Sequence, residues 1–438
     1  MQFKQYPSYK NSGVEWLGKV PEHWRIVRTK DIFNHRKEEA LDDDEIVTAF
    51  RDGQVTLRKN RRTDGFTNSL KEHGYQHINS GDLVIHEMDA FAGAIGVSDS
   101  SGKSTPVYTV CYAKNENINH HFYSHFFRTM AKTGFINSLA KGIRVRSTEF
   151  RWNESRNVYL AEPPKADQEK IVSFLDTETA RIDTLIAKQE KLIELLEEQR
   201  KSIISHAVTK GLNPNAPMKD SGVEWLVDVP EHWEVVKSKR LFWCKGGFAF
   251  SSDDFFEEGN YPVIRISNIQ DKSISTDKIV YVNSCTKKVF NQFSAYTGDL
   301  IFCMTGASLG KVGLLPKELS FALINQRVGR LDITSYAIKQ FVFYLVSSHG
   351  FQTNIRMLGV GLTDNFPNIS SDLIGIVDVV LPPLVEQQGI VNHLEIENSK
   401  IDTLIEKQNQ LIDKLKEYRA SIISHAVTGK IDVREFGA

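Results

Sequence analysis

A thirteen-residue segment containing two tryptophans occurs twice in the chain. It reads SGVEWLGKVPEHW over residues 12–24 and SGVEWLVDVPEHW over residues 221–233. A longer segment is also repeated: it begins PPKADQEKIVSF at Pro163 and PPLVEQQGIVNH at Pro382, and both copies contain the octapeptide SIISHAVT. Two long copies far apart in the sequence indicate a duplication rather than a solenoid of short repeats. We therefore expect two related halves in one chain.

The longer repeat predicts a long helix in each half. In both copies the seam positions step by three and four residues, as in a coiled coil, with charged residues on the flanks. An apolar seam is unfavourable in water, so we expect the two helices to pack on each other. Gln189 and Gln408 take equivalent seam positions, where they either set the register or are tolerated at the edge. The predicted seam is Ile182, Leu185, Gln189, Leu192, Leu196, Gln199 and Ile203 in the first helix, and Ile401, Leu404, Gln408, Leu411, Leu415, Tyr418 and Ile422 in the second.

The segments between the repeats, residues 25–160 and 234–380, have diverged. Short β-branched runs such as DLVIHE and DLIFCM predict strands, and stretches such as HFYSHFFRTMA predict amphipathic helices. The fold class is therefore mixed α/β (α+β), with each globule followed by a long helix in an internal repeat. We expect a first globular domain over 1–165, a helix over 166–213, a second globular domain over 214–382, and a helix with a tail over 383–438. The repeated tryptophans Trp16, Trp24, Trp225 and Trp233 are interpreted as packing anchors.

Composition limits the class of protein. At 438 residues the chain is long enough for two domains, and 41% of its residues are hydrophobic and 25% charged. The sequence contains no run of about 18 apolar residues, the length that spans a bilayer, and its first residues do not resemble a signal peptide. The four cysteines form no CxxC pair. We expect a cytoplasmic protein with no membrane-spanning segment, no metal site and no disulfide framework. The net charge of −1 means that any nucleic-acid surface must be local.

Basic residues cluster in the diverged segments, especially in FRDGQVTLRKNRRTDGF and KGIRVRSTEFRWNESR of the first half. Arg and Lys neutralise phosphates and read guanine, while Asn and Gln read adenine. A solvated surface of no function is the alternative interpretation. The candidate DNA-binding residues are Arg51, Arg58, Lys59, Arg61, Arg62, Lys141, Arg144, Arg146 and Arg151 in the first globule, and Lys245, Arg265, Lys311, Asn325, Gln326, Arg327, Thr363 and Asn365 in the second.

The sequence shows no catalytic motif. GVSDSSGKST lacks the spacing of a phosphate-binding loop and precedes a predicted strand, and HEMDA lacks the second histidine of a zinc protease. No GxGxxG loop follows a strand. His206 and His425 occupy equivalent positions in the repeated helices, where an interface or capping role is the simpler interpretation. We expect no catalytic or metal-binding residues.

The order of a variable globule, a helix with DQEKIV, IDTLI and ISHAVT elements, and then both again resembles the specificity subunit of a type I restriction-modification enzyme. NQRVGRL in the second globule and RDGQVTLRKNRR in the first also resemble this family. The resemblance implies two target recognition domains that each read one half of an interrupted sequence in double-stranded DNA. It further implies that the long helices pack antiparallel as a spacer and that the chain itself is not an enzyme.

The same resemblance implies partners. Two methyltransferase subunits would dock on the helical regions, and restriction (motor) subunits would join for cleavage. S-adenosylmethionine would be bound by the methyltransferase partner, so no cofactor is expected on this chain. Two alternatives remain at the level of sequence: a coiled-coil protein–protein scaffold with peptide-binding globules, and a stand-alone nuclease or methyltransferase.

Overall fold

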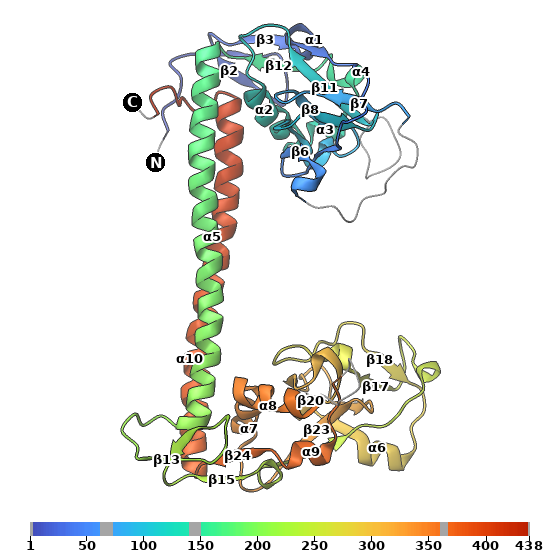
Figure 1. Ribbon diagram of the computed structural model, residues 1–438, viewed down its shortest axis with the longest axis vertical. Coiled ribbons are helices and arrows are strands. Elements are labelled where there is room, and N and C mark those ends of the chain that lie inside the picture. The colour runs from blue at the N-terminus through green and yellow to red at the C-terminus, as the bar shows by residue number, and fades with distance from the viewer. Residues whose placement is uncertain (1–2, 62–72, 140–149, 360–366, 437–438) are drawn as a thin grey trace. The chain divides into compact units, whose positions relative to one another are not determined.

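The computed structural model describes residues 3–61, 73–139, 150–359 and 367–436 (Figure 1). The chain divides into two compact units, one made of residues 1–189 and 409–438 and the other of residues 190–408. The chain crosses from one unit to the other twice, once inside each long helix, so each unit contains a globule and a part of each helix. The long helices are α5 (Lys165–Lys210) and α10 (Leu384–Val427).

The first unit is built on a four-stranded antiparallel sheet. Its strand order is β4-β11-β8-β9, and helix α2 packs against it. The side chain of Asn119 caps α2 by accepting hydrogen bonds from two backbone N–H groups of its first turn. The elements of the globule are β1 (Tyr9–Asn11), β2 (Lys19–Pro21), β3 (Arg25–Arg28), α1 (Thr29–Ile32), β4 (Phe33–His35), β5 (Val47–Ala49), β6 (Val55–Leu57), β7 (Gln76–Ile78), β8 (Leu83–His86), β9 (Ile95–Val97), β10 (Gly102–Ser104), β11 (Tyr108–Ala113), α2 (His120–Lys132), α3 (Phe135–Ser138), α4 (Trp152–Ser155) and β12 (Tyr159–Glu162).

The second unit repeats this sheet. Strands β16, β23, β20 and β21 follow one another in the same antiparallel order, and a further four-stranded sheet, β18-β17-β22-β19, contains one parallel pair, β17 with β22. The elements are β13 (Met218–Asp220), β14 (Asp228–Pro230), β15 (Glu234–Lys237), β16 (Phe242–Gly246), β17 (Tyr261–Ile264), β18 (Val280–Val282), α6 (Lys287–Phe293), β19 (Ser294–Tyr296), β20 (Leu300–Cys303), β21 (Val312–Leu314), β22 (Phe321–Ile324), β23 (Val328–Ile333), α7 (Lys339–Ser347), α8 (His349–Gly359), α9 (Ser371–Gly375) and β24 (Asp378–Leu381).

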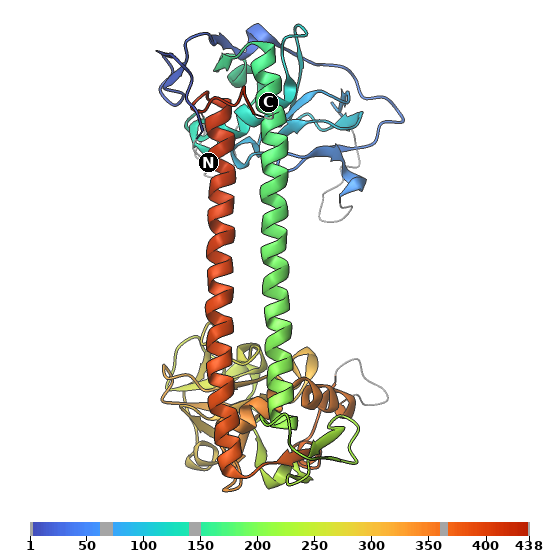
Figure 2. The same ribbon diagram turned by 90° about the vertical axis from the view of Figure 1, so that its left-hand side faces the viewer.

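The cores extend from the globules into the helices. In the first unit, Ile171, Phe174 and Leu175 of α5 share a buried cluster with Ala426 and Val427 of α10. In the second unit, Ile204, Ala207 and Val208 of α5 share one with Ile390 and Leu394 of α10. Each globule is therefore packed against both long helices, which lie side by side in Figure 2.

The seam of the helices differs from the prediction at several positions. Ile182, Leu196, Ile401 and Ile422 are buried, and Leu185, Gln189, Ile203, Gln408 and Leu415 are half-buried. Leu192, Leu404 and Leu411 were predicted in the seam, but they are 39, 43 and 41% exposed. Gln199 and Tyr418 are exposed as well. The residue that follows each of the three exposed leucines, Ile193, Ile405 and Ile412, is the one turned inward.

Two ion pairs join the helices, one in each unit. Arg419 of α10 donates to both carboxylate oxygens of Asp183 of α5, at 2.8 and 3.1 Å. In the second unit Arg200 of α5 donates to Asp402 of α10 at 2.5 Å. Arg200 and Arg419 occupy equivalent positions in the two copies of the repeat, so the duplication has kept one interhelical contact in each half.

Candidate nucleic-acid interface

The repeated PEHW tetrapeptide attaches each globule to the start of its long helix. In the first globule Trp24 is fully buried, and its indole Nε1 donates to Oδ2 of Asp167, which also lies 2.8 Å from Nε2 of His23. In the second globule Trp233 donates to Glu386 at 2.9 Å, and His232 lies 2.7 Å from the same carboxylate. The tryptophans thus act as buried anchors whose polar edge is satisfied by a carboxylate of the first helical turn.

A buried glutamine strengthens each attachment. The side-chain amide of Gln168 donates to the carbonyls of Pro163 and Asn117, and its oxygen accepts from the backbone of Asn119. Gln387 makes the corresponding three bonds in the second unit, to Pro382, Tyr336 and Ile338. These bonds explain why the PP…Q element is repeated.

The C-terminal end of each long helix, or the residues just after it, contacts the tryptophan segment of the other globule. Lys430, just beyond α10, donates to the carbonyls of Leu17 and Lys19, and Lys210 at the end of α5 donates to those of Leu226 and Asp228. Gly429 has φ +71°, and a Cβ there would lie 2.3 Å from Pro21. The repeated segments therefore join the globules to the long helices in both units.

The first globule carries an arginine-lined concave surface of 870 Å³ beside strands β5 and β8. Arg51, Arg58 and Arg61, all predicted from the sequence, line it together with His86 and Tyr108. We call it the arginine surface.

Carboxylates hold two of these arginines in place. Arg61 forms an ion pair with Asp52 at 2.6 Å and stacks over the ring of Phe50, with its guanidinium carbon 4.2 Å from the ring centroid. The hydrogen bond from Arg61 is the largest cause that lowers the pKa of Asp52, so this carboxylate stays charged. Arg51 pairs with Asp89 at 3.0 Å. Both arginine side chains remain partly exposed, so their guanidinium groups are oriented yet accessible to an anion.

Burial sets the ionisation of the other groups on this surface. It lowers the pKa of His86, in opposition to the charge of Asp89, and raises the pKa of Tyr108 to about 12. The histidine is therefore biased towards its neutral form, and Tyr108 keeps its proton. The arginines are therefore the groups on this surface that carry positive charge near neutral pH.

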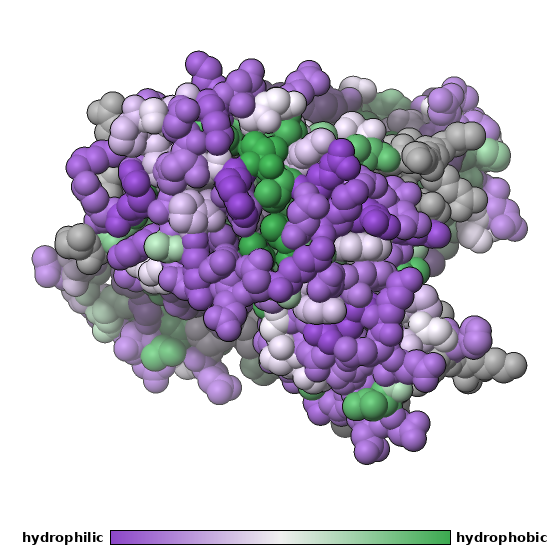
Figure 3. Space-filling view, turned by 90° about the horizontal axis from the view of Figure 1, so that it is seen from above, coloured by the Kyte–Doolittle hydropathy of each residue, from purple (hydrophilic) through white to green (hydrophobic). Residues whose placement is uncertain are grey.

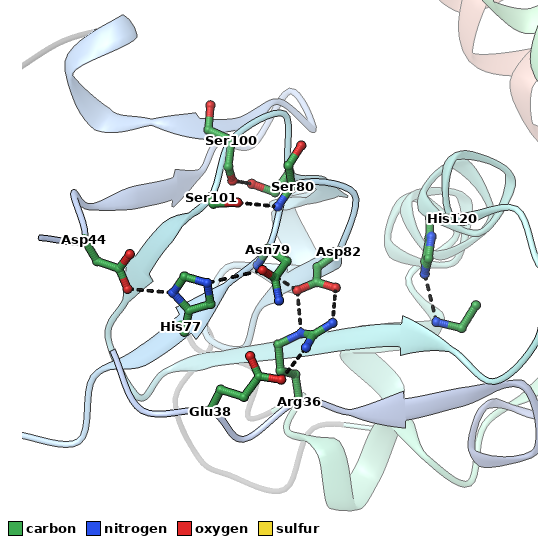
Figure 4. A network of polar contacts seen from close by, with 12 residues as sticks. Arg36, Glu38, Asp44, His77, Asn79, Ser80, Asp82, Ser100, Ser101 and His120 are labelled. Atoms are coloured by element: carbon green, nitrogen blue, oxygen red, sulfur yellow. Dashed lines mark hydrogen bonds and ion pairs between the residues drawn. The ribbon is translucent and has the colours of Figure 1, made fainter. Parts of the chain in front are cut away.

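A polar network fixes the segment that leads into the arginine surface (Figure 4). Arg36 donates to both oxygens of Asp82, at 2.7 and 3.0 Å, and to Glu38. Nδ1 of His77 lies 2.6 Å from Asp44, which shortly precedes Ile46, where the lining of the arginine surface begins. The segment that leads to Arg51 and Arg61 is therefore tied to β7 through Asp44.

Two further candidates of the first globule, Lys59 and Arg151, are not among the described residues that line the arginine surface. Lys59 is paired with Glu45, and Arg151 lies 3.8 Å from Glu87. Arg62, Lys141, Arg144 and Arg146 are outside the described residues.

The candidates of the second globule that lie in described ranges do not line one common cavity. Lys245 lies 3.7 Å from Asp332, the guanidinium of Arg265 lies over the ring of Phe255, and Lys311 lines a separate groove. Gln326 and Arg327 are exposed in the turn between β22 and β23, and the side chain of Asn325 accepts a hydrogen bond from the backbone of Gln326. Thr363 and Asn365 are outside the described residues.

Two residues of α2, His125 and Arg128, were not identified as candidates from the sequence. Nδ1 of His125 and Nε of Arg128 are buried without a hydrogen-bond partner in the structure. Burial lowers the pKa of His125 to about 3, with the charges of Arg128 and Arg419 as further causes. No signal in the sequence marks this cluster, because HHFYSHFFRTMAK is typical of any amphipathic helix.

In the described ranges, no group of three or more His, Cys, Asp or Glu side chains is placed to hold a metal ion. The four cysteines are free. None of the helices described is long and apolar enough to cross a membrane. Hydrophilic side chains cover most of the face in Figure 3, and apolar side chains gather there in one narrow strip.

The fold and these surfaces define a class of duplicated two-globule proteins built on long paired helices. Comparison with known proteins gives the family. Residues 230–417 match the family described as Type I restriction modification DNA specificity domain. Over nearly its whole length the chain is similar to specificity subunits of type I restriction-modification enzymes.

Two relatives match the chain over nearly its full length. The MjaVIII specificity subunit of Methanocaldococcus jannaschii is 26% identical over 99% of this chain and 98% of its own length. The EcoKI specificity subunit of Escherichia coli K12 is 24% identical, covering 94% of this chain and 90% of its own.

Two solved structures share the fold. A chain from a study of complex assembly and conformational transition of the type I R-M system has a TM-score of 0.67 at 16% identity, covering 93% of this chain and 98% of its own. The HsdS subunit from Thermoanaerobacter tengcongensis has a TM-score of 0.54 at 16% identity, over 94% of this chain and 98% of its own.

Proposed function

We propose that this chain is the DNA-reading subunit of a type I restriction-modification complex. Each globule reads one half of an interrupted target, and the chain performs no catalysis of its own. One observation carries the proposal: the two globules share a sheet order and equivalent attachments to the helices, while the residues on their exposed surfaces differ. A conserved frame with unlike surfaces is what a reader of two unlike half-sites needs.

The arginine surface is the recognition surface proposed for the first globule. Arg51 and Arg61 are oriented by carboxylates and remain accessible, the arrangement that allows a guanidinium to meet guanine or phosphate oxygens with two hydrogen bonds. In the second globule the exposed Gln326 and Arg327 are the corresponding candidates.

We further propose that α5 and α10 form an antiparallel coiled coil that serves as the spacer of a pseudo-twofold molecule. The two interhelical ion pairs support it. Asp183 of α5 pairs with Arg419 of α10 in one unit, and Arg200 of α5 pairs with Asp402 of α10 in the other. From the first pair to the second, the residue number rises in α5 by as much as it falls in α10. A constant antiparallel register requires this relation. Gln189 and Gln408, both half-buried, belong to this seam.

Protein partners are proposed for the outer surface of the helices. Leu192 and Leu195 of α5 and Leu404 and Leu411 of α10 are exposed by 39–47%, which suits contact with methyltransferase subunits. Two such subunits, one for each repeat, would bring S-adenosylmethionine and the catalytic residues, and restriction subunits would join them.

The exposed leucines also favour a second candidate, a protein–protein scaffold whose globules bind peptides. Electrophoretic mobility shift of the full chain with its methyltransferase partner, over a salt series, separates the two functions. A DNA reader loses affinity with a slope of about 0.9 log units per log unit of salt for each phosphate neutralised. A scaffold would show no duplex binding above that of an unrelated protein of the same charge, and this result would overturn the proposal.

A further inference from the structure

A cationic groove of 310 Å³ lies in the second unit, where the end of α5 meets α8 and the turn before β21. Its described lining includes Lys201, Lys272, Lys311, Arg356 and His349, against Asp271 as the one carboxylate. We call it the lysine groove. Only Lys311 was a candidate from the sequence, and neither the recognition surfaces nor the exposed leucines include the others.

The cations of the lysine groove lack the carboxylate partners found elsewhere on the molecule. Arg51, Lys59 and Arg61 each have an acidic partner within 3.0 Å. In the part of the chain that the structure describes, Lys201, Lys272, Lys311 and Arg356 form no ion pair within 4 Å. Several like charges around a single lining carboxylate repel one another, so a bound anion would stabilise them.

The backbone around the groove is held in unusual conformations. Lys272 has φ +61°, a left-handed conformation that non-glycine residues adopt rarely and mainly where the surrounding structure imposes it. Gly310 has φ +88°, and a Cβ there would lie 2.2 Å from Oε1 of Gln352. Gln352 donates to the carbonyls of Gly310 and Val346, both at 2.5 Å, so the groove has a rigid polar wall.

Two further observations indicate that this wall is incomplete without a ligand. The hydroxyl oxygen of Ser347 lines the groove and is buried without a hydrogen-bond partner in the structure. Burial lowers the pKa of Lys272, and the charges of Arg200 and Lys201 lower it further, against Asp271 and Glu197. A ligand with acceptor oxygens and negative charge would satisfy both groups.

The first unit places cations at the equivalent end of its helix. Burial is the largest cause that lowers the pKa values of Arg128 and Lys132, and the charge of Arg419 lowers both further. Arg419 corresponds to Arg200 in the repeat. The junction of helix end and globule is therefore cationic in both halves of the duplication.

We propose that the lysine groove binds a backbone phosphate of the DNA duplex, independently of base sequence. This inference rests on the proposed DNA-reading function and adds a second kind of contact to it. An acidic protein is the less suitable occupant, because the centres of protein interfaces are apolar and depleted of charge, whereas this wall is polar and cationic. Phosphate contacts fix register and orientation, while base contacts supply specificity.

The test measures duplex affinity against salt by fluorescence anisotropy, with the full chain in complex with its methyltransferase partner. Lys272→Gln/Lys311→Gln is compared with Lys287→Gln/Lys288→Gln, which removes the same charge from two exposed lysines of α6. The groove variant should reduce the salt slope by about 0.9 for each phosphate that it no longer neutralises, and the α6 variant should not. Lys201→Gln, on a helix surface, repeats the test with little risk to folding.

Each other outcome overturns the inference. Equal slopes for the groove variant and the wild type, or an equal reduction in the α6 variant, would mean that the groove does not hold a phosphate of the duplex. Dissociation of the methyltransferase partner with an unchanged slope would make the groove a protein-docking surface. Inorganic phosphate could also weaken duplex binding by the wild type more than chloride does at equal ionic strength. If the groove variant then kept the wild-type salt slope, the groove would be a site for free phosphate. A wild-type complex that binds no duplex would instead refute the proposed function itself.

Discussion

The indole Nε1 of Trp24 donates a hydrogen bond to Oδ2 of Asp167, 143 residues further along the chain. The carboxylate belongs to the first turn of α5, and the tryptophan lies in the core of the first globule. This contact, and its counterpart between Trp233 and Glu386, explains why one short segment occurs twice: it joins a globule to its helix in each half.

Removing the carboxylate should destabilise the first unit. Asp167→Ala leaves the buried indole N–H without its acceptor, so we expect the free energy of unfolding to fall by about 1–3 kcal/mol. Urea denaturation of the full chain measures it, with Asp176→Ala, an exposed carboxylate of the same helix, as the control. Equal effects of the two substitutions would contradict the role given to Asp167.

Acid should destabilise the first unit through His125. The pKa of this buried histidine is lowered to about 3 in the folded protein, whereas an unfolded histidine titrates near 6.5. Between these values the unfolded state binds the extra proton, so stability is present above pH 6.5 and is lost as the pH falls. At pH 5 the loss should be about 2 kcal/mol.

His125→Gln should therefore flatten the dependence of unfolding free energy on pH between 7 and 5. His121→Gln, on the exposed side of the same helix, is the control. A wild-type pH dependence that persists in His125→Gln and disappears in His121→Gln would show that the wrong histidine has been identified.

Arg61 should contribute directly to DNA binding. Arg61→Gln removes a guanidinium that is oriented by Asp52 and Phe50, so we expect a loss of about 1–3 kcal/mol in duplex affinity at constant salt. Arg434→Gln is a matched control, because Arg434 has a similarly exposed side chain and also pairs with a carboxylate, Asp432, at 2.6 Å. If the two variants lose equal affinity, the arginine surface has no special role.

Lengthening the helices should alter the spacing of the target before its identity. Four residues inserted at matched positions in α5 and α10 add about 6 Å, less than two base-pair steps of about 3.4 Å. Sequencing of the methylated bases should show a changed gap between unchanged half-sites. Changed half-sites with an unchanged gap would contradict the proposed spacer.

The duplication, the mixed α/β globules with long helices and the family could all be predicted from the sequence. The phase of the seam could not. Leu192–Ile193, Leu404–Ile405 and Leu411–Ile412 are adjacent apolar residues, so a step of three followed by four fits the pattern as well as four followed by three. Only packing decides which member of each pair turns inward.

The candidate site was predictable in part, because arginine clusters are visible in a sequence while their partners are not. The ion pairs of Arg51 with Asp89 and Lys59 with Glu45 join residues whose spacing carries no local signal. The lysine groove joins residues from four separate segments: the end of α5, the loop at 271–272, the turn before β21, and α7 with α8. Such clusters depend on tertiary structure and need coordinates to be seen.

Exchange of residues 25–160 for the corresponding segment of another specificity subunit tests the account most directly. The modified bases of a host that carries the complete system would be sequenced before and after the exchange. If each globule reads one half-site, half of the methylated sequence changes, while the other half and the gap remain. A change in both halves, or in neither, would contradict it.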